Sequence, residues 1–386
     1  MIAKAILIIL ILLVGFLILL PFVSSTLAPV NVLPFGGSGR GGNTSTAGGG
    51  LMLSIDGGEH WESVAFSEDR RTRFPSQLFD LAFHPREPDI LYLGAKSNGL
   101  WKSANGGASW QKIKDRSNTL DPRADVFRIA VSPSRPSTIY LAIFQNRRGQ
   151  ILKSEDGGET FQQIYAVTAN GFGIFDLYVN PRNEKHVFIA TGQGGVLETQ
   201  NGGASWKVKK WFGDPVVRLY LNPLTTNEIY IQSRDHRLLK SFDSGDEWIA
   251  LSVSSGANPA PVTYPPREGI LSPLPGSKSS SLVLAIDSQT PSTLYAGTSQ
   301  GVLRSLDGGF NWKLFDIAVP PESLPIAALA IHPRNSSTIF VAAGKELYQT
   351  LDEGEHWSIR TLPIKADVDK LFIHPQRPEN MLVFLK

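Results

Sequence analysis

The chain has 386 residues, of which 42% are hydrophobic and 19% are charged, so it can bury a large core. Its net charge of +2 gives no reason to expect a nucleic-acid partner. The absence of cysteine excludes disulfides, thiol catalysis and cysteine-ligated zinc. No motif for a cofactor or metal ion is evident, and we expect neither. The 36 glycines and 26 prolines are typical of many turns that join short strands.

The N-terminus differs from the rest of the chain. Residues 5–23 are uncharged and almost wholly aliphatic, and they follow Lys4. As a helix rising about 1.5 Å per residue, this segment is long enough to cross a hydrocarbon layer of about 30 Å. We therefore expect residues 1–24 to be a transmembrane signal-anchor, with a cleaved signal peptide as the alternative. The Gly/Ser-rich residues 25–50 are expected to form a flexible linker.

The positive charges before this segment predict the location of everything after it. The N-terminal amine and Lys4 are expected to stay in the cytoplasm. The rest of the chain should then lie outside the cytoplasm, in a periplasm, in a lumen or at the cell surface. It would be secreted if the N-terminal segment were cleaved.

From residue 51 onward one short motif occurs seven times, which indicates a repeat architecture. It reads Ser or Thr, any residue, Asp or Asn, any residue, Gly, two further residues and an aromatic. The glycine suits a tight hairpin turn, the polar side chains can hydrogen-bond that turn, and the aromatic residue can pack. We interpret these residues as structural: Asp56, Asn105, Asp156, Asn201, Asp243, Asp307, Asp352, Trp61, Trp110, Phe161, Trp206, Trp248, Trp312 and Trp357.

A second phrase alternates with this motif. It is an apolar strand, a polar-Pro corner and another apolar strand, as in Leu81 to Pro85 followed by Ile90 to Leu93. We name these strands A and B, and the motif joins strands C and D. The chain ends on an A–B pair and residue 51 opens a C–D pair, so the two half-blades should close a ring. Residues 51–386 are therefore predicted to form an all-β, seven-bladed β-propeller of four-stranded antiparallel blades.

The motif resembles the Asp-box, or BNR, repeat over residues 51–386. That repeat is shared by sialidases, xyloglucanase-type glycoside hydrolases, sortilin and the photosystem II assembly/stability factors. One seven-bladed propeller behind an export segment is most similar to the assembly-factor group, which implies protein partners, including a membrane complex. Sialidases are six-bladed and carry an Arg-Ile-Pro motif that this chain lacks. Xyloglucanase-type enzymes pair two propellers around a cleft.

Loop lengths predict which face of the propeller binds. Intervals from the motif aromatic to the next corner vary from 17 to 40 residues, whereas the other intervals are nearly uniform. The D–A and B–C loops should share one face, and variable loops on a rigid scaffold commonly carry binding sites. Arginines in these loops suit carboxylate or phosphate, although ordinary solvated loop charge is the alternative. They are Arg70, Arg71, Arg73, Arg147, Arg148, Arg234 and Arg237.

The start of each A strand predicts a ring around the central channel. The seven residues are Asp80, Arg128, Asp176, Arg218, Val283, Ala328 and Lys370. Their alternating charges favour salt bridges that line the channel. The alternative is a glycan site, because glycoside hydrolysis uses two carboxyl groups about 5–9.5 Å apart, here Asp80 and Asp176. A separation well outside that window, or bidentate pairing of each carboxylate with Arg128, would argue against it.

Three further features remain. The Pro- and Ser-rich D–A loop at residues 251–280 is either a lid or strap for a partner or a plain insertion. Trp211 and Tyr264 are loop aromatics that could stack on a sugar or peptide. His84, His332 and His374 occupy equivalent corners, which indicates a structural role.

These observations favour a non-catalytic, extracytoplasmic scaffold that presents its D–A and B–C loops to a protein partner or membrane complex. The alternative is a glycan-active hydrolase or a glycan-binding protein that uses the channel mouth. If the protein is an enzyme, we expect a glycoside hydrolase.

Overall fold

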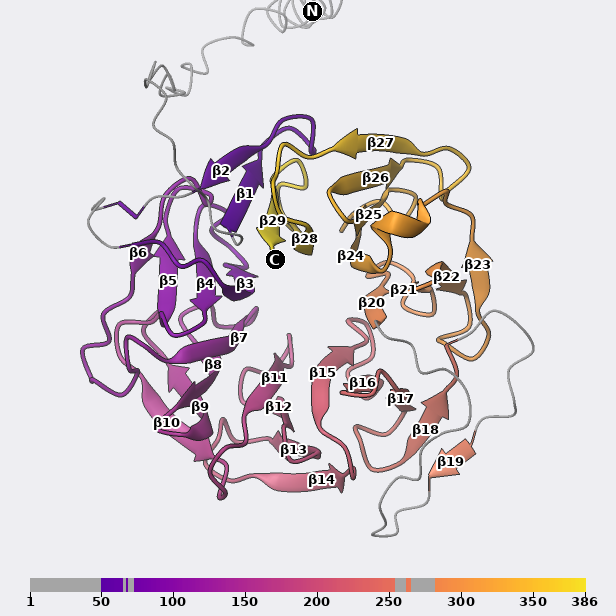
Figure 1. The fold of residues 1–386 in the computed structure, drawn as a ribbon. Coiled ribbons are helices and arrows are strands. Elements are labelled where there is room, and N and C mark those ends of the chain that lie inside the picture. Colours follow the sequence, from indigo (N-terminus) through magenta and orange to yellow (C-terminus); the bar gives the residue numbers. More distant parts are fainter. Residues whose placement is uncertain (1–49, 65–66, 69–72, 254–261, 265–281) are drawn as a thin grey trace, which may run out of the picture. The chain divides into compact units, whose positions relative to one another are not determined.

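The computed structural model describes residues 50–64, 67–68, 73–253, 262–264 and 282–386. The described residues form seven antiparallel sheets arranged as blades around a central axis (Figure 1). The seven-bladed, all-β prediction is confirmed. The expected anchor lies outside these residues, as does the expected linker except for its last residue, Gly50, which begins a strand. Within the described ranges no helix is long and apolar enough to span a membrane.

We number the blades in chain order, with strands A to D in sequence. Blade 1 holds β3 (Leu78–Phe83), β4 (Leu91–Ala95), β5 (Leu100–Ser103) and β6 (Gln111–Lys112); blade 2 holds β7 (Asp125–Val131), β8 (Ile139–Gln145), β9 (Arg148–Ser154) and β10 (Gln162–Ala166). Blade 3 holds β11 (Ile174–Val179), β12 (Val187–Thr191), β13 (Gly195–Thr199) and β14 (Lys207–Trp211); blade 4 holds β15 (Val216–Leu221), β16 (Ile229–Ser233), β17 (Leu238–Ser241) and β18 (Trp248–Leu251). Blade 5 holds β20 (Leu282–Ile286), β21 (Leu294–Thr298), β22 (Gly301–Ser305) and β23 (Lys313–Phe315); blade 6 holds β24 (Ile326–Ile331), β25 (Ile339–Ala343), β26 (Glu346–Thr350) and β27 (Ser358–Thr361). Blade 7 combines β28 (Val368–Ile373) and β29 (Met381–Leu385) with β1 (Gly50–Ser54) and β2 (Glu62–Val64).

One blade departs from the four-stranded prediction. In blade 4 a fifth strand, β19 (Val262–Tyr264), pairs with the outer strand β18. It belongs to the long D–A loop, whose other residues 254–261 and 265–281 lie outside the described part. The Pro- and Ser-rich composition of that loop gave no reason to expect a strand, but its residues 262–264 pair with the exposed edge strand β18.

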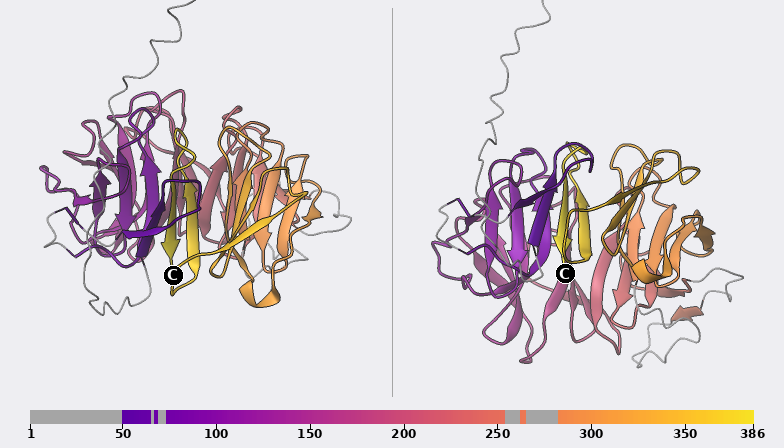
Figure 2. Two further views of the ribbon diagram at one scale, coloured as in Figure 1. Left: turned by 90° about the horizontal axis from the view of Figure 1, so that it is seen from above. Right: turned by 45° about the horizontal axis from the view of Figure 1, so that its top comes forward.

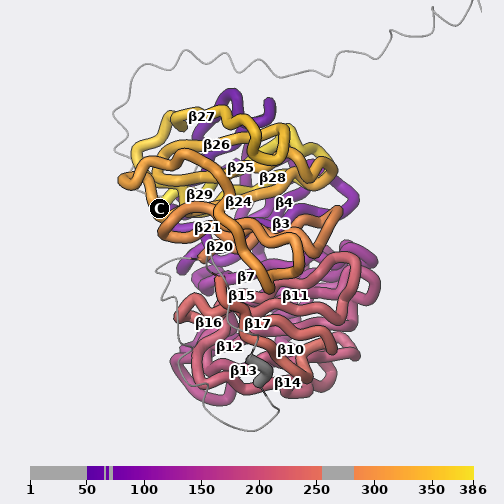
Figure 3. Tube along the Cα trace, turned by 90° about the vertical axis from the view of Figure 1, so that its right-hand side faces the viewer, coloured from indigo at the N-terminus to yellow at the C-terminus, as the bar shows by residue number. Residues whose placement is uncertain are grey.

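The ring closes through strands from opposite ends of the sequence, as predicted. β1 pairs antiparallel with β29 from Gly50↔Leu385 to Ser54↔Met381. Figure 1 shows indigo β1 beside yellow β29, and Figure 3 shows the C-terminal end of β29 from the side. Two half-blades thereby become one sheet, and their inner edges are paired.

The core lies between neighbouring blades. All five residues of strand β4 are buried, as are all five in β12, β16, β21 and β25. These B strands contact a neighbouring blade on each side, which explains their continuous apolar runs. The contact is close at Gly94, where a Cβ atom would lie 2.6 Å from the backbone oxygen of Val126 in blade 2.

The strands run between two faces at which the turns gather (Figure 2). We call the face with the A–B corners and the motif turns the corner face, and the face with the B–C turns and D–A connections the loop face. In each motif turn the Ser or Thr hydroxyl donates to the Asp or Asn and accepts from a glycine amide. The polar motif residues therefore hold turns.

The motif aromatics pack and hydrogen-bond in two ways. The indole nitrogens of Trp61, Trp110, Trp248 and Trp312 donate to the glycine carbonyl of their own turn. Those of Trp206 and Trp357 donate instead to the preceding blade, at Ile164 O and Asp316 O. Phe161 is also buried, and its side chain has no polar atom that needs a hydrogen bond.

The corner histidines have the structural role that was predicted. Nδ1 of His84 accepts the amide of Glu87 at 2.9 Å, and Nδ1 of His374 accepts that of Arg377 at 3.1 Å. His332 accepts the amide of Arg334 at 3.2 Å. Each ring thereby fixes the corner between strands A and B.

Candidate functional site

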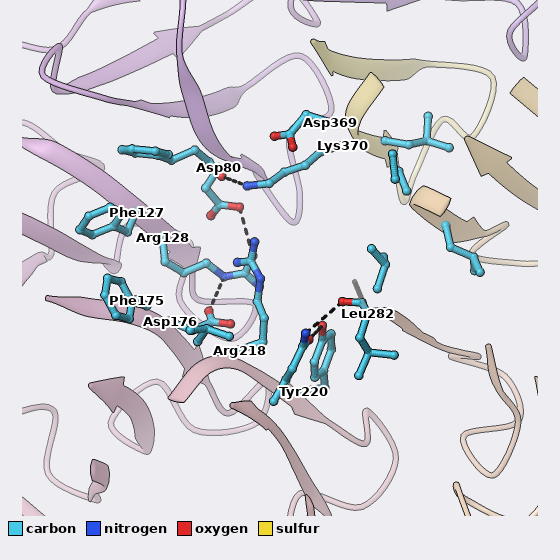
Figure 4. Close-up of a pocket in the computed structure, with 18 of the residues that line it drawn as sticks. Asp80, Phe127, Arg128, Phe175, Asp176, Arg218, Tyr220, Leu282, Asp369 and Lys370 are labelled. Carbon is cyan, nitrogen blue, oxygen red and sulfur yellow. Dashed lines mark hydrogen bonds and ion pairs between the residues drawn. The ribbon is translucent and has the colours of Figure 1, made fainter. Parts of the chain in front are cut away.

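The first parts of the A strands enclose a central cavity of about 660 Å³. Residues from all seven blades line it, and Arg234 in the B–C turn of blade 4 places its mouth at the loop face. Figure 4 shows many of these side chains converging from different blades. All seven positions of the predicted ring line this cavity: Asp80, Arg128, Asp176, Arg218, Val283, Ala328 and Lys370.

A second ring lines the same cavity and was not predicted. It consists of the residue just before each position of the first ring: Phe79, Phe127, Phe175, Val217, Leu282, Ala327 and Asp369. Six of the seven A strands have a register shift at this point, and only β20 pairs regularly. A β-bulge leaves an extra residue unpaired and re-aims it. Strict alternation of strand side chains would have placed these residues away from the channel.

Three of these residues form an aromatic wall. The ring centroids of Phe79 and Phe127 lie 4.9 Å apart, and those of Phe127 and Phe175 lie 5.5 Å apart in an edge-on arrangement. All three are only partly buried. Blades 1 to 3 therefore present a continuous apolar surface to whatever enters the cavity.

Beside this wall, Arg128 joins the two predicted carboxylates. Its Nη1 lies 3.1 Å from Oδ1 of Asp80, and its Nε lies 2.9 Å from Oδ1 of Asp176. The carboxylates are almost fully buried, whereas a third of the arginine side chain is exposed. Burial alone would lower the pKa of Arg128, but Asp176 and Asp80 raise it above its ordinary value. The expected channel-lining salt bridges are thus present at Arg128.

Backbone amides occupy the remaining carboxylate oxygens. Oδ2 of Asp80 accepts the amide of Ile129 in blade 2 at 2.8 Å. Oδ2 of Asp176 accepts the amide of Leu219 in blade 4 at 2.9 Å. Each aspartate therefore binds the A strand of the following blade, and both oxygens of each carboxylate have a partner. As catalytic acid and base they would first have to leave Arg128.

The cavity is also lined by Arg218, Lys370 and Arg234, none of which forms an ion pair with a carboxylate in the described residues. Within the described residues Arg218 makes no ion pair or hydrogen bond, although it lines the cavity and is partly exposed. Nζ of Lys370 donates to the backbone oxygen of Phe79. Burial, followed by repulsion from Arg218, lowers the pKa of Lys370 to about 8. Arg234 is exposed at the mouth.

Blade 4 contributes a polar wall. The hydroxyl of Tyr220 donates to Oε1 of Gln232 at 3.1 Å, and Nε2 of Gln232 donates to the backbone oxygen of Leu282 at 3.0 Å. Burial raises the pKa of Tyr220. This chain of bonds joins blades 4 and 5 and orients the tyrosine ring along the cavity (Figure 4).

Of the five predicted loop arginines that the structure describes, only Arg234 lines this cavity. Arg73 and Arg147 are exposed elsewhere, Nε of Arg148 donates to Asn170 at 2.7 Å, and Arg237 pairs with Asp235 at 3.2 Å. Arg70 and Arg71 lie outside the described residues. The nearby polar partners hold Arg148 and Arg237 in their own loops.

The remaining candidates lie elsewhere. Trp211 is half-exposed at the end of β14 and does not line the cavity. For Tyr264 only the backbone is described. In the described part of the chain, Asp352, Glu355 and His356 form the one group with metal-ligand chemistry, and they lie on the corner face. Nδ1 of His356 is already 2.7 Å from Oδ2 of Asp352.

Comparisons with known proteins find similarity to two groups, xyloglucanases and YCF48. No protein-family model matches the chain. Among curated proteins, an oligoxyloglucan-reducing end-specific xyloglucanase of Emericella nidulans is 29% identical over 150 residues, which are 35% of this chain and 18% of that protein. A xyloglucanase of a Paenibacillus species is 25% identical over 283 residues, covering 68% of this chain and 23% of the enzyme. The matches thus span about a fifth of the relatives' length.

Two kinds of solved structure share the architecture. The GH74 xyloglucanase of Xanthomonas campestris superposes with a TM-score of 0.62 at 14% identity, over 84% of this chain and 52% of the enzyme. YCF48 bound to a D1 peptide superposes with a TM-score of 0.58 at 14% identity, over 80% of this chain and 93% of YCF48. The protein has the propeller fold of both groups. At these identities the likeness establishes the fold alone, and the suspected resemblance to both groups is confirmed at that level.

Proposed function

We propose that the protein is a non-catalytic binding scaffold whose central cavity receives an acidic peptide segment of a protein partner. The observation that carries this proposal is the asymmetry of the cavity. Arg128 pairs with both buried aspartates, and its single charge offsets one of their two charges. Arg218 makes no ion pair in the described residues, and Arg234 is exposed at the mouth. An arginine fork suits a peptide carboxylate.

The opposite wall suits the rest of such a segment. Phe79, Phe127 and Phe175 offer an apolar surface, and Tyr220 adds a ring with a polar end. A cavity of about 660 Å³ accommodates a few residues, within the usual size of ligand sites. YCF48, which shares this fold over most of its length, has been solved with a D1 peptide, and this supports a peptide as the ligand class.

The experiment is a binding measurement with short synthetic peptides that end in acidic residues, each made with a free and with an amidated carboxyl terminus. The full chain is used in nanodiscs. We expect the acidic peptides to bind, and Arg218→Gln combined with Arg234→Gln to weaken binding by about tenfold or more, since charge-assisted hydrogen bonds are worth about 1.5–3 kcal/mol.

The matched control is Arg147→Gln, an exposed arginine on the same face but outside the cavity. It should bind like the parent protein. Equal affinity of acidic peptides and of their neutral Asn/Gln counterparts would overturn the proposal, as would equal effects of the cavity and control variants.

A glycan-active or glycan-binding protein is the second candidate, because the curated relatives quoted above are xyloglucanases. The aromatic wall would suit a sugar. Hydrolysis of xyloglucan that is lost in both Asp80→Asn and Asp176→Asn would favour this candidate over the first. The position of Arg128 between the two carboxylates argues against it.

We further propose that residues 5–23 anchor the protein in a membrane and hold the propeller outside the cytoplasm. The support is the uncharged aliphatic run after Lys4. Retention in the membrane after alkaline washing, with protease digesting the propeller only from the extracytoplasmic side, is the expected result. Recovery of a soluble, processed protein would favour a cleaved signal instead.

A further inference from the structure

The corner face carries an uneven distribution of exposed apolar side chains. The second position of the motif is apolar and large in four successive blades: Phe242 in blade 4, Leu306 in blade 5, Leu351 in blade 6 and Ile55 in blade 7. These side chains are 41%, 62%, 66% and 67% exposed, respectively. The same position in blades 1 to 3 holds Ala104, Glu155 and Gln200.

Contacts join the motif turns of these four blades to their neighbours. The rings of Phe242 and Phe310 stack across blades 4 and 5 with centroids 6.2 Å apart. Arg304 in blade 5 lies 3.0 Å from Glu353 in blade 6. Arg360 in blade 6 pairs with Glu59 in blade 7. We call the motif turns of blades 4 to 7 the apolar-acidic arc: residues 54–61, 241–248, 305–312 and 350–357.

Three other exposed apolar residues lie in the same blades. Leu224 lies in the A–B corner of blade 4, and Leu314 and Ile359 lie on the outer strands of blades 5 and 6. Seven of the ten large apolar residues exposed in the described part of the chain therefore belong to blades 4 to 7. Isolated exposed apolar residues need no explanation, but a concentration over adjacent elements marks an interaction site.

The arc is also acidic. Its four turns contain no Lys or Arg and hold nine carboxylates. Glu59, Asp246 and Glu353 pair with Arg360, Lys209 and Arg304 of flanking strands. The six that have no Lys or Arg partner in the described residues are Asp56, Asp243, Glu247, Asp307, Asp352 and Glu355. Backbone hydrogen bonds, with that from His60 the largest effect at Asp56, lower the pKa of Asp56 and Asp352 to about 2. These carboxylates thus hold their turns and still carry full negative charge at neutral pH.

We infer that the apolar-acidic arc is a docking surface for a basic amphipathic segment of a protein partner. The exposed side chains of Leu306, Leu351 and Ile55 offer apolar contacts to such a segment, and the carboxylates without a Lys or Arg partner complement its basic residues. An anionic membrane surface would be repelled by the same charges. The site lies on the face opposite the cavity mouth, so this inference does not depend on the peptide-binding function proposed above.

The absence of cysteine allows a direct experiment with the full chain in membranes of the source cells. Leu306→Cys and Leu351→Cys are labelled with a photoactivatable crosslinker and illuminated. Gln200→Cys and Ala104→Cys are matched controls at the same motif position in blades 3 and 1. We expect adducts several times more abundant from positions 306 and 351, and mass spectrometry should map them to a protein segment rich in Lys or Arg and amphipathic as a helix.

Charge reversal provides the second readout. Glu247→Lys together with Glu355→Lys should abolish the adduct while the melting temperature of the propeller is retained. Adducts to lipid, to a second copy of this chain or to an acidic or neutral segment would each overturn the inference. So would equal labelling from the control positions, or an adduct insensitive to charge reversal.

Discussion

Arg128 in blade 2 reaches across a blade boundary to Asp80 in blade 1, with its Nη1 3.1 Å from Oδ1 of the carboxylate. Through Nε the same guanidinium holds Asp176 of blade 3. One side chain thereby connects three successive blades at the channel. It also decides which charges of the cavity remain available to a ligand.

Loss of this arginine should destabilise the propeller. Arg128→Gln leaves Asp80 and Asp176 as buried carboxylates without a cation, and breaking a buried ion pair in this way costs about 3–5 kcal/mol. The free energy of unfolding, measured by urea denaturation, should fall by that order. Arg147→Gln, an exposed loop arginine, should change it by less than about 0.5 kcal/mol. A small effect of Arg128→Gln would show that the carboxylates are adequately held by their backbone amides.

Binding of an acidic peptide should depend on pH through Lys370. Its pKa of about 8 means that the ammonium is charged below pH 8 and neutral above it. The peptide carboxylates stay ionised over that range, so affinity should be constant below pH 7 and fall by up to about tenfold per pH unit above 8. Titration calorimetry from pH 6.5 to 9.5 measures this. Lys370→Met should bind more weakly and lose the dependence; an unchanged pH profile in that variant would assign the effect to another group.

Close approach of blades 1 and 2 should make Gly94 intolerant of a side chain. The added Cβ of Gly94→Ala would meet the backbone oxygen of Val126 at 2.6 Å, and backbone cannot move aside as a flexible side chain can. Overpacking of this kind costs about 1–3 kcal/mol. Gly50→Ala is the strand control, because its nearest neighbour would be 4.0 Å away. Thermal melting should separate the two variants, and equal melting temperatures would contradict a rigid contact.

Ring closure should be indispensable. Deleting Met381–Lys386 removes β29, which leaves both β1 and β28 without their partner. We expect the truncated chain to lose its cooperative thermal transition, whereas deletion of Lys386 alone, beyond the end of β29, should preserve it. A truncated chain that still melts cooperatively would show that six complete blades suffice.

Much of the architecture was predictable because each blade repeats the same local chemistry. The motif hydroxyls, carboxylates and glycines interact within a few residues, so their turns follow from the sequence. The ring from Asp80 to Lys370 was also predictable, because strand A is innermost in every blade. Strand β19 was not, since three residues in a Pro- and Ser-rich loop pair only because an exposed edge strand lies nearby.

The details of the cavity were less accessible. Phe79, Phe127 and Phe175 each precede a ring position, so regular strand alternation would point their side chains away from the channel. A bulge in each strand instead places them in the lining of the cavity. The phenylalanine repeated at the same position of three successive A strands was the sequence feature that could have indicated this aromatic wall. Nor could spacing alone show that Arg148 bonds Asn170 while Arg234 reaches the cavity.

By itself the sequence determined the number of blades, the turn chemistry and the closure of the ring, because all three depend on contacts within one repeat or on the order of strands. Only the tertiary structure decided which charges meet. Asp80, Arg128 and Asp176 follow one another at intervals of 48 residues along the chain and come together only when blades 1, 2 and 3 pack side by side. The same packing leaves Arg218 without an ion pair in the described residues, and that unpaired charge at the channel defines the candidate site.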